Sequence, residues 1–393
     1  MNTTATGAGH VDVFVRNATG IVRQARTSDA FFYNVMWSSV TLTFAFFWIL
    51  YPFYYQGANA LLAIVFAALL GLPGAFLYAM LAQIMPRTGG DYVFNSRTLH
   101  PAIGFMGNFS YCFWLAIVYG VYTTYIATYG VGAFSRMMAG FTGSAGWLSF
   151  GAWFSTSWGL FITGSVLVIV SAVIFLLGGT RVFFRVQVAC FALYILGCVL
   201  VIIIGAVQSP AGFAGNFSSY AAHLGKANAV QALDASAAKG GFAPARFDLA
   251  ATIRAVSVFW FTYASNYFAG EIRSTKRAHI YAIPGAALLA VVLLLILTVA
   301  YTHVASYDFN SKLGDATPAA YGFSAGAPAY PEIAAIASGS PVWGTLIILG
   351  FAVGLLIWLP QTMLLISRSM FAWSFDRLMP DRLSYLDERS HSP

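Results

Sequence analysis

The longest tract without a charged residue constrains the fold of this chain more than any other feature. Residues 30–86 contain no Asp, Glu, Lys, Arg or His. A helix that crosses a bilayer needs about 20 apolar residues, so this tract is predicted to hold two membrane spans, with a turn near residues 51–59. Only 8% of the 393 residues are charged, against about a quarter in a typical soluble domain. The sequence therefore predicts a polytopic membrane protein.

Six further charge-poor tracts have the length and composition of membrane-spanning helices. They cover residues 101–135, 157–177, 186–207, 254–270, 281–303 and 342–366. A transmembrane β-barrel is disfavoured, because its strands alternate in hydropathy while these tracts are continuously apolar. The predicted fold class is an all-α integral membrane protein with eight transmembrane helices.

The distribution of Lys and Arg predicts the orientation, because cytoplasmic loops retain an excess of both. With the amino terminus in the cytoplasm, fourteen of the twenty basic residues lie inside, and only six lie outside: Arg136, Lys226, Lys239, Arg246, Arg254 and Lys312. We therefore expect a multi-pass protein of the plasma membrane whose residues 1–29 form a cytoplasmic tail. The net charge of +7 then reflects topology and contact with anionic membrane lipids, and no nucleic-acid partner is expected.

Two long segments are predicted to lie outside the cell. Residues 208–250 are rich in Ala, Gly and Ser, and residues near 304–341 include YPEIAAIASGSP, which could form a short surface helix starting near Pro331. Three cysteines, Cys112, Cys190 and Cys198, fall inside predicted spans without metal-ligand spacing. No cofactor is expected. The sequence does not identify a coupling ion, and both a proton and a sodium ion stay candidates.

The most polar stretch between two spans is PRTGGDYVFNSRTLHPAIGF, residues 86–105. As a cytoplasmic loop, it would use Pro86 to stop a helix, Gly89 and Gly90 to turn, and Arg87 and Arg97 to stay inside. The string also resembles the signature that follows the second helix in the amino acid, polyamine and organocation (APC) superfamily of transporters.

Three other segments resemble the same superfamily in the same order. GGTRVFFRVQ, residues 178–187, is similar to the short basic loop before its fifth helix. FAGEIRSTKRAHIYAI, residues 268–283, is similar to the loop that closes its sixth helix. Residues 367–393 resemble the amphipathic segment after its eighth helix. The chain therefore resembles the amino acid permeases of this superfamily.

The resemblance implies a leucine-transporter-like bundle of two inverted repeats. Residues 30–207 would form the first five-helix repeat, and residues 251–366 the first three helices of the second. Residues 367–393 would form a cytoplasmic amphipathic segment. Because a ninth and a tenth helix complete the second repeat in the superfamily, we expect that the chain as given is truncated and does not transport alone.

The resemblance also implies a substrate site where the first and sixth helices break at the midplane and expose backbone N–H and C=O groups. The candidate substrate-binding residues are Ser38, Ser39, Val40, Thr41, Leu42 and Thr43, then Trp260, Phe261, Thr262, Tyr263, Ala264 and Ser265, with Tyr119 and Tyr122 from the third span. Two alternatives stay open. The Ser and Thr hydroxyls could bond back within an unbroken helix, and the tyrosines could serve helix packing.

The positions of the ionisable residues bear on function. His, Asp and Glu lie in tails, in loops or at span ends, which disfavours a membrane enzyme or a metal site. A site without buried charge suits a neutral amino acid or a similar small zwitterion better than a polyamine. We therefore expect a secondary active transporter that works by alternating access. The alternatives are a transporter-like sensor or a non-functional fragment, and a membrane-integral enzyme is less favoured.

Overall fold

The computed structural model describes residues 23–38, 58–226, 228–231, 233, 247–256, 262–273, 275–306, 309, 312 and 330–385. Across these residues the secondary structure is helical, apart from isolated bridges at Ala25–Ile272 and Thr88–Phe268. Five of the described helices are long and apolar enough to cross a membrane. The all-α membrane fold predicted from the sequence is confirmed.

The second and third predicted spans are present as long helices. The second is α4 (Ala60–Ile84), which begins where the Asn59 side chain accepts a hydrogen bond from the backbone of Leu62. The third is α6 (Pro101–Tyr125), which continues through a π-helical segment, η1 (Ile126–Gly132), into α7 (Ala133–Thr142). Pro101 occupies the first turn of α6, where its missing N–H leaves no bond unmade.

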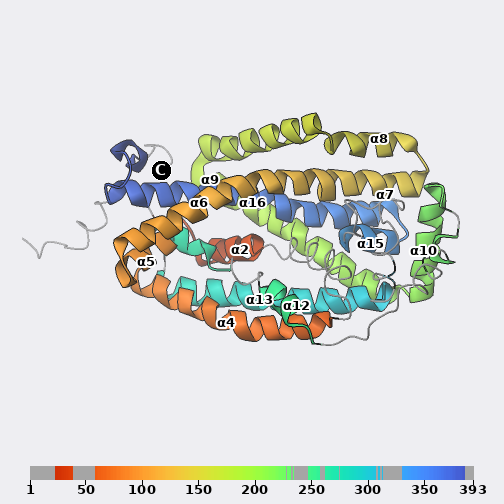
Figure 1. Cartoon of the computed structure of the whole chain (residues 1–393), viewed down its shortest axis with the longest axis horizontal. Coiled ribbons are helices and arrows are strands. Elements are labelled where there is room, and N and C mark those ends of the chain that lie inside the picture. The colour runs from red at the N-terminus through yellow and green to blue at the C-terminus, as the bar shows by residue number, and fades with distance from the viewer. Residues whose placement is uncertain are drawn as a thin grey trace, which may run out of the picture.

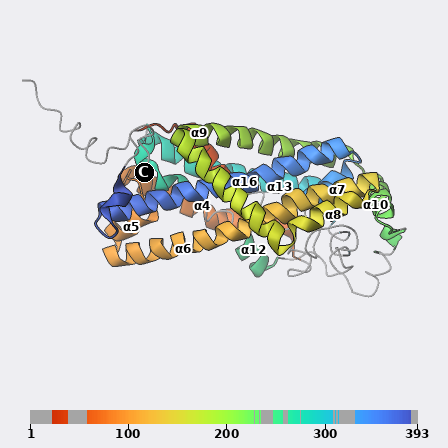
Figure 2. The same cartoon turned by 90° about the horizontal axis from the view of Figure 1, so that it is seen from above.

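The fourth and fifth predicted spans are two limbs of one bent helix, α9 (Ser157–Val207). The bend is at Gly179, whose φ of 56° and ψ of −154° are accessible to glycine alone. The loop predicted for residues 178–187 is therefore wrong, because the chain reverses at one glycine and resumes the helix at once. Figures 1 and 2 show the two limbs diverging from this bend.

The centre of the molecule is formed by α2 (Thr27–Trp37), α13 (Thr275–Val304) and α16 (Pro341–Phe375) (Figure 1). The most apolar stretches of α13 and α16 are 61% and 67% buried, whereas those of α4, α6–α7 and α9 are 28–33% buried. The seventh and eighth predicted spans are thus the core of the described bundle, and the others present one face to lipid.

The sixth predicted span is not a single helix within the described residues. Helix α12 (Leu249–Val256) precedes residues 257–261, which lie outside the described residues. Two 3₁₀ turns then follow, η3 (Ala264–Tyr267) and η4 (Ala269–Glu271). The resemblance predicts a break in this span, and residues 262–270 form turns instead of a continuous helix. Small and polar residues here make local contacts instead of a helical ladder, as the broken-helix expectation requires.

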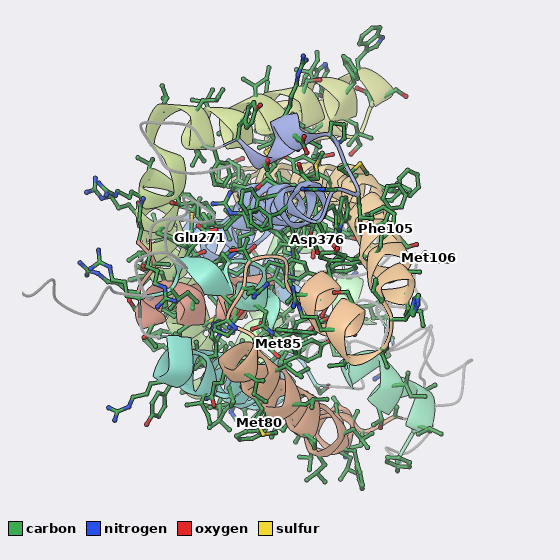
Figure 3. The ribbon with its side chains drawn as sticks, turned by 90° about the vertical axis from the view of Figure 1, so that its left-hand side faces the viewer. Met80, Met85, Phe105, Met106, Glu271 and Asp376 are labelled. Atoms are coloured by element: carbon green, nitrogen blue, oxygen red, sulfur yellow. The ribbon has the colours of Figure 1, made fainter. Side chains whose placement is uncertain are left out.

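The connecting elements gather at two opposite ends (Figure 1). One end holds α5 (Asp91–Thr98), the bend of α9 and η6 (Asp381–Ser384), all predicted to be cytoplasmic. Figure 3 looks onto this end, where Met85, Phe105, Glu271 and Asp376 lie. The other end holds α8 (Ala145–Phe154), α10 (Pro210–His223) and α15 (Tyr330–Ala337). The two sets are separated as predicted, and which end faces the cytoplasm stays a prediction.

Helix α15 forms where a helix was expected, but it does not lie on the surface. All eight of its residues are buried. Glu332 accepts hydrogen bonds from Nε and Nη2 of Arg136 at 2.9 and 2.6 Å. A third Arg136 bond reaches the carbonyl of Thr128, which lies in the π-helical segment η1. The ion pair with α7 therefore allows α15 to be buried with its charge neutralised.

Candidate substrate site

The chain just before α2 is joined to the end of the 262–273 segment by backbone hydrogen bonds. The Ala25 N–H donates to the Glu271 carbonyl at 3.0 Å, and the Arg273 N–H donates to the Ala25 carbonyl at 3.0 Å. Ala25 and Ile272 are both almost fully buried. The start of the first span and the end of the sixth are therefore held together, although they are far apart in sequence.

A second contact joins α2 to η3. The Asn34 side chain donates to Ser265 Oγ at 2.9 Å, and the Ser265 N–H donates to Asn34 Oδ1 at 2.8 Å. Asn34 Nδ2 also lies 3.4 Å from the carbonyl of Ala282 on α13. Asn34 and Ser265 are fully buried. The amide thus satisfies the Ser265 N–H, a backbone group that a continuous sixth helix would have satisfied internally.

The carboxyl end of α2 lies directly before the first candidate segment. Helix α2 ends at Trp37, and Ser38 follows as its cap, with its hydroxyl donating to the Val35 carbonyl at 2.7 Å. Ser38 therefore bonds back onto its own helix, as one of the two open alternatives anticipated. Ser39, Val40, Thr41, Leu42 and Thr43 lie outside the described residues.

An aromatic stack extends from α2 across α16 to α6. The Trp37 and Trp358 rings stack at 4.7 Å, and the Tyr122 ring stacks on Trp358 at 3.7 Å. Trp37 and Trp358 are among the largest fully buried side chains of the described residues. Of the two tyrosines proposed from the third span, Tyr122 thus lies next to the end of α2.

Tyr119 lies elsewhere. Its hydroxyl bonds to Ser171 Oγ on α9 at 3.1 Å. This contact joins α6 to the first limb of α9, which is the packing role that was left open for the tyrosines. The structure therefore groups Tyr122, and not Tyr119, with the end of α2, through Trp358.

The second candidate segment is described from Thr262 onward, and Trp260 and Phe261 lie outside the described residues. Thr262, Ala264 and Ser265 are buried. Tyr263 is half-buried, and its ring stacks on Tyr78 of α4 at 3.8 Å. The described residues of both candidate segments thus meet through Asn34. Residues 39–43 and 260–261 lie outside the described residues.

A polar network missed by the sequence analysis supports α2 from behind. The Tyr33 hydroxyl donates to the Gln361 carbonyl at 2.8 Å, and Gln361 Nε2 lies 3.2 Å from the Tyr33 carbonyl. Gln361 Nε2 also lies 3.2 Å from Gln187 Oε1, and Gln187 in turn donates to the Asp29 carbonyl at 3.1 Å. Amides inside apolar tracts were the available signal, because polar groups in a span seldom face lipid.

One buried ion pair was also missed. Arg368 on α16 donates through Nε and Nη2 to the two carboxylate oxygens of Glu271, at 2.7 and 2.9 Å. Their side chains are 1% and 7% exposed. Both residues had been assigned to cytoplasmic loops from their positions at span ends. The fork geometry shows that Arg368 neutralises Glu271 and fixes η4 against α16.

The PRTGGDY stretch packs directly on the sixth segment. The Gly89 N–H donates to the Tyr267 carbonyl at 3.0 Å. Gly90 has a φ of +51°, and a Cβ on it would lie 2.8 Å from the Tyr267 ring. Tyr92 donates to Asp376 Oδ2 at 2.6 Å, at the end of α16. The two glycines are therefore required for close approach as well as for the turn.

A bundle of membrane-crossing helices that encloses polar groups around interrupted segments is the architecture in which secondary transporters build their substrate sites. The described residues contain no cluster of three or more His, Cys, Asp or Glu that could hold a metal ion. The chain belongs to the amino acid permease family, whose family model matches residues 28–393. None of the curated proteins matches the chain. The resemblance stated from the loop motifs is confirmed, and the family indicates a transporter rather than an enzyme.

Proposed function

We propose that this permease carries a neutral amino acid or a similar small zwitterion across the plasma membrane by alternating access. The observation that carries the proposal is the Asn34–Ser265 contact, which brings the end of α2 and η3 together. Both elements begin or end beside a candidate segment, residues 38–43 or residues 260–265. Backbone groups freed near these ends would bind the carboxylate and ammonium groups of the substrate.

The side chains around this junction support a neutral substrate. The described ones are hydroxyl, amide or aromatic: Asn34, Trp37, Ser38, Tyr122, Thr262, Tyr263, Ser265 and Trp358. Glu271, the buried acid on the same segment, is paired with Arg368, and Asp91 of α5 accepts a hydrogen bond from the Tyr267 hydroxyl. A selective cation or anion site would need a charged group of its own. Aromatic walls with a few polar groups are typical of sites for small, partly apolar ligands.

Alternating access is supported by closures at both ends of the described bundle. Arg136 and Glu332 join α7 to α15 at one end, and Arg368 and Glu271 join α16 to η4 at the other. Opening one end of the bundle requires the contacts at that end to be broken while the contacts at the other end are kept. Ion pairs in which two guanidinium nitrogens bind one carboxylate are suited to such discrete states, because both hydrogen bonds are made or lost together.

The proposed function is tested by uptake into liposomes that contain the purified protein. We expect saturable uptake of one or more neutral amino acids, competed by other neutral amino acids and not by a polyamine. Ligand binding without uptake would favour a membrane sensor, and chemical change of the ligand in detergent would favour an enzyme. Saturable uptake of a polyamine, with no response to neutral amino acids, would refute the substrate class.

Two candidate residues outside the described ones allow a sharper test of the site. If Trp260 shapes the side-chain pocket, Trp260→Ala alters the preference among neutral amino acids. If backbone groups bind the α-carboxylate and α-amino groups, Thr41→Val has a mild effect on all of them. A uniform loss with Trp260→Ala, or a strong loss with Thr41→Val, would contradict this division of roles.

A further inference from the structure

Three carboxylates are enclosed between elements in the described part of the chain, and their partners differ. Glu271 is bound by Arg368, and Glu332 is bound by Arg136. The third, Asp91 at the start of α5, is bound by Tyr267, whose hydroxyl donates to Asp91 Oδ2 at 2.8 Å. No basic side chain among the described residues pairs with Asp91. Asp91 is half-buried, and a carboxylate partly shielded from water without a cation binds a proton more readily than an exposed one.

The surroundings of Asp91 are aromatic hydroxyls and amides. Tyr78 of α4, Tyr111 of α6, and Tyr263 and Tyr267 of the sixth segment all interact with its charge. Asn108 of α6 lies 3.2 Å from the Tyr267 hydroxyl through its Nδ2. The remaining titratable group on α6 that interacts with Asp91 is Cys112.

The basic residues of the same loop do not compensate Asp91. Arg87 and Arg97 are exposed. Asp376 of α16 is bound by Tyr92, the next residue along α5. The described groups that interact with Asp91 are tyrosine hydroxyls and the Cys112 thiol, with no cation among them. Burial is the largest influence and raises the pKa of Asp91 above its ordinary value, while hydrogen bonds from Tyr267 and Tyr78 lower this pKa in part.

Asp91 also lies at a junction that must separate if this end of the bundle opens. Within a few residues of it, the Gly89 N–H binds the Tyr267 carbonyl, and Gly90 packs on the Tyr267 ring. Thr88 bridges Phe268. Withdrawal of the sixth segment from this loop would remove the Tyr267 hydroxyl and admit water to the carboxylate.

We propose that Asp91 is a proton-binding site that senses whether the junction between residues 88–91 and residues 267–270 is closed. A proton from water binds a carboxylate oxygen of Asp91 while the junction is closed, and it returns to water when the junction opens. No other bond is made or broken in this step. The inference rests on the proposed function only in taking this opening as a step of transport.

Linkage fixes the direction of the effect. Asp91 binds its proton more tightly in the closed junction than in an open one, where water restores its ordinary affinity. Proton binding therefore stabilises the closed junction, and low pH favours it. Raising the pH favours the open junction, because the ionised carboxylate is better solvated there.

The first test is an infrared titration of the purified full chain, which follows the carboxylic acid C=O band. We expect a band that titrates above the range of an exposed Asp. It should be lost in Asp91→Asn and kept in the matched control Asp376→Asn. Tyr267→Phe removes a bond that favours the ionised form, so it should move the midpoint to higher pH. A wild-type spectrum without such a band, or one unchanged by Asp91→Asn, would overturn the proposal.

The second test measures opening of the junction without transport. In a background where Cys112, Cys190 and Cys198 are replaced by Ser, Thr88→Cys is labelled with a water-soluble maleimide. The labelling rate, corrected for thiolate content with an exposed Arg382→Cys control, should fall several-fold as the pH is lowered. This dependence should vanish with Asp91→Asn. Its persistence in Asp91→Asn would refute the role of Asp91, whereas a failure of amino acid uptake would bear only on the proposed function.

Discussion

Asn34 and Ser265, separated by 231 positions in the sequence, exchange two hydrogen bonds in the interior of the bundle. The Asn34 amide donates to Ser265 Oγ at 2.9 Å, and the Ser265 N–H donates to Asn34 Oδ1 at 2.8 Å. One side chain thus satisfies both a hydroxyl and a backbone group of η3. This contact fixes the position of the sixth segment relative to the end of α2.

Asn34→Leu should destabilise the protein more than Ser265→Ala. The leucine leaves the Ser265 N–H and hydroxyl without their partner, and each unsatisfied buried group costs about 1–3 kcal/mol. Ser265→Ala keeps the backbone bond to Asn34 Oδ1, so we expect a loss of about 0.5–1.5 kcal/mol. Denaturation of the purified variants in one detergent measures both. Equal stability of Asn34→Leu and wild type would show that the contact does not hold η3.

The buried ion pair predicts strong coupling between Arg368 and Glu271. Arg368→Met leaves a buried carboxylate without its cation, which should cost about 3–5 kcal/mol. The double variant Arg368→Met with Glu271→Met removes both charges and should be more stable than Arg368→Met alone. A double-mutant cycle in the unfolding midpoint checks this, and additive losses would argue against direct pairing.

The glycine turn before α5 should tolerate no larger residue. In Gly90→Val the side chain would enter the Tyr267 ring at a φ of +51°, which β-branched residues rarely adopt. We expect poor folding or slow turnover, with little change in residual substrate affinity, because the loop lies at the end of the bundle. Gly107→Ala on α6 is the matched control, since nothing lies within 4 Å of its added Cβ. A selective loss of affinity in well-folded Gly90→Val would contradict this.

The charge distribution predicts which end of the molecule faces the cytoplasm. In a background without Cys112, Cys190 and Cys198, a cysteine that replaces Lys226 should react with an impermeant reagent added to intact cells. One that replaces Thr88 should react only after the membrane is opened. The reverse pattern would invert the topology and move α5 outside.

Most of the bundle could be predicted because hydropathy reports membrane spans directly. The sequence predicts a loop where α9 bends, because a pair of glycines with a nearby Arg is typical both of a loop and of a sharp bend in a helix. The structure differs because Gly179 alone accommodates the reversal. Helix α15 was located correctly, but its burial was not foreseen. Its Glu332 is neutralised by Arg136, a contact between residues far apart in the sequence.

The candidate site was predictable only in part. Clusters of Ser, Thr and aromatic residues pointed to Ser265 and Tyr122, which the structure places near the end of α2. Asn34 was overlooked, although an amide in an apolar tract is a usable signal. Glu271 and Arg368 were read as loop charges, because the pattern along the chain reports the depth of a residue but not its partner.

The central claim is that a neutral amino acid binds where α2 meets η3, and equilibrium binding to the purified protein tests it most directly. A panel of neutral amino acids, a polyamine and a dicarboxylate should compete with a labelled neutral amino acid. We expect competition by the neutral amino acids alone, weakened by Ser265→Ala and unchanged by Ser171→Ala, a matched buried serine on α9. Tight binding of the polyamine or the dicarboxylate, with no binding of neutral amino acids, would contradict the account.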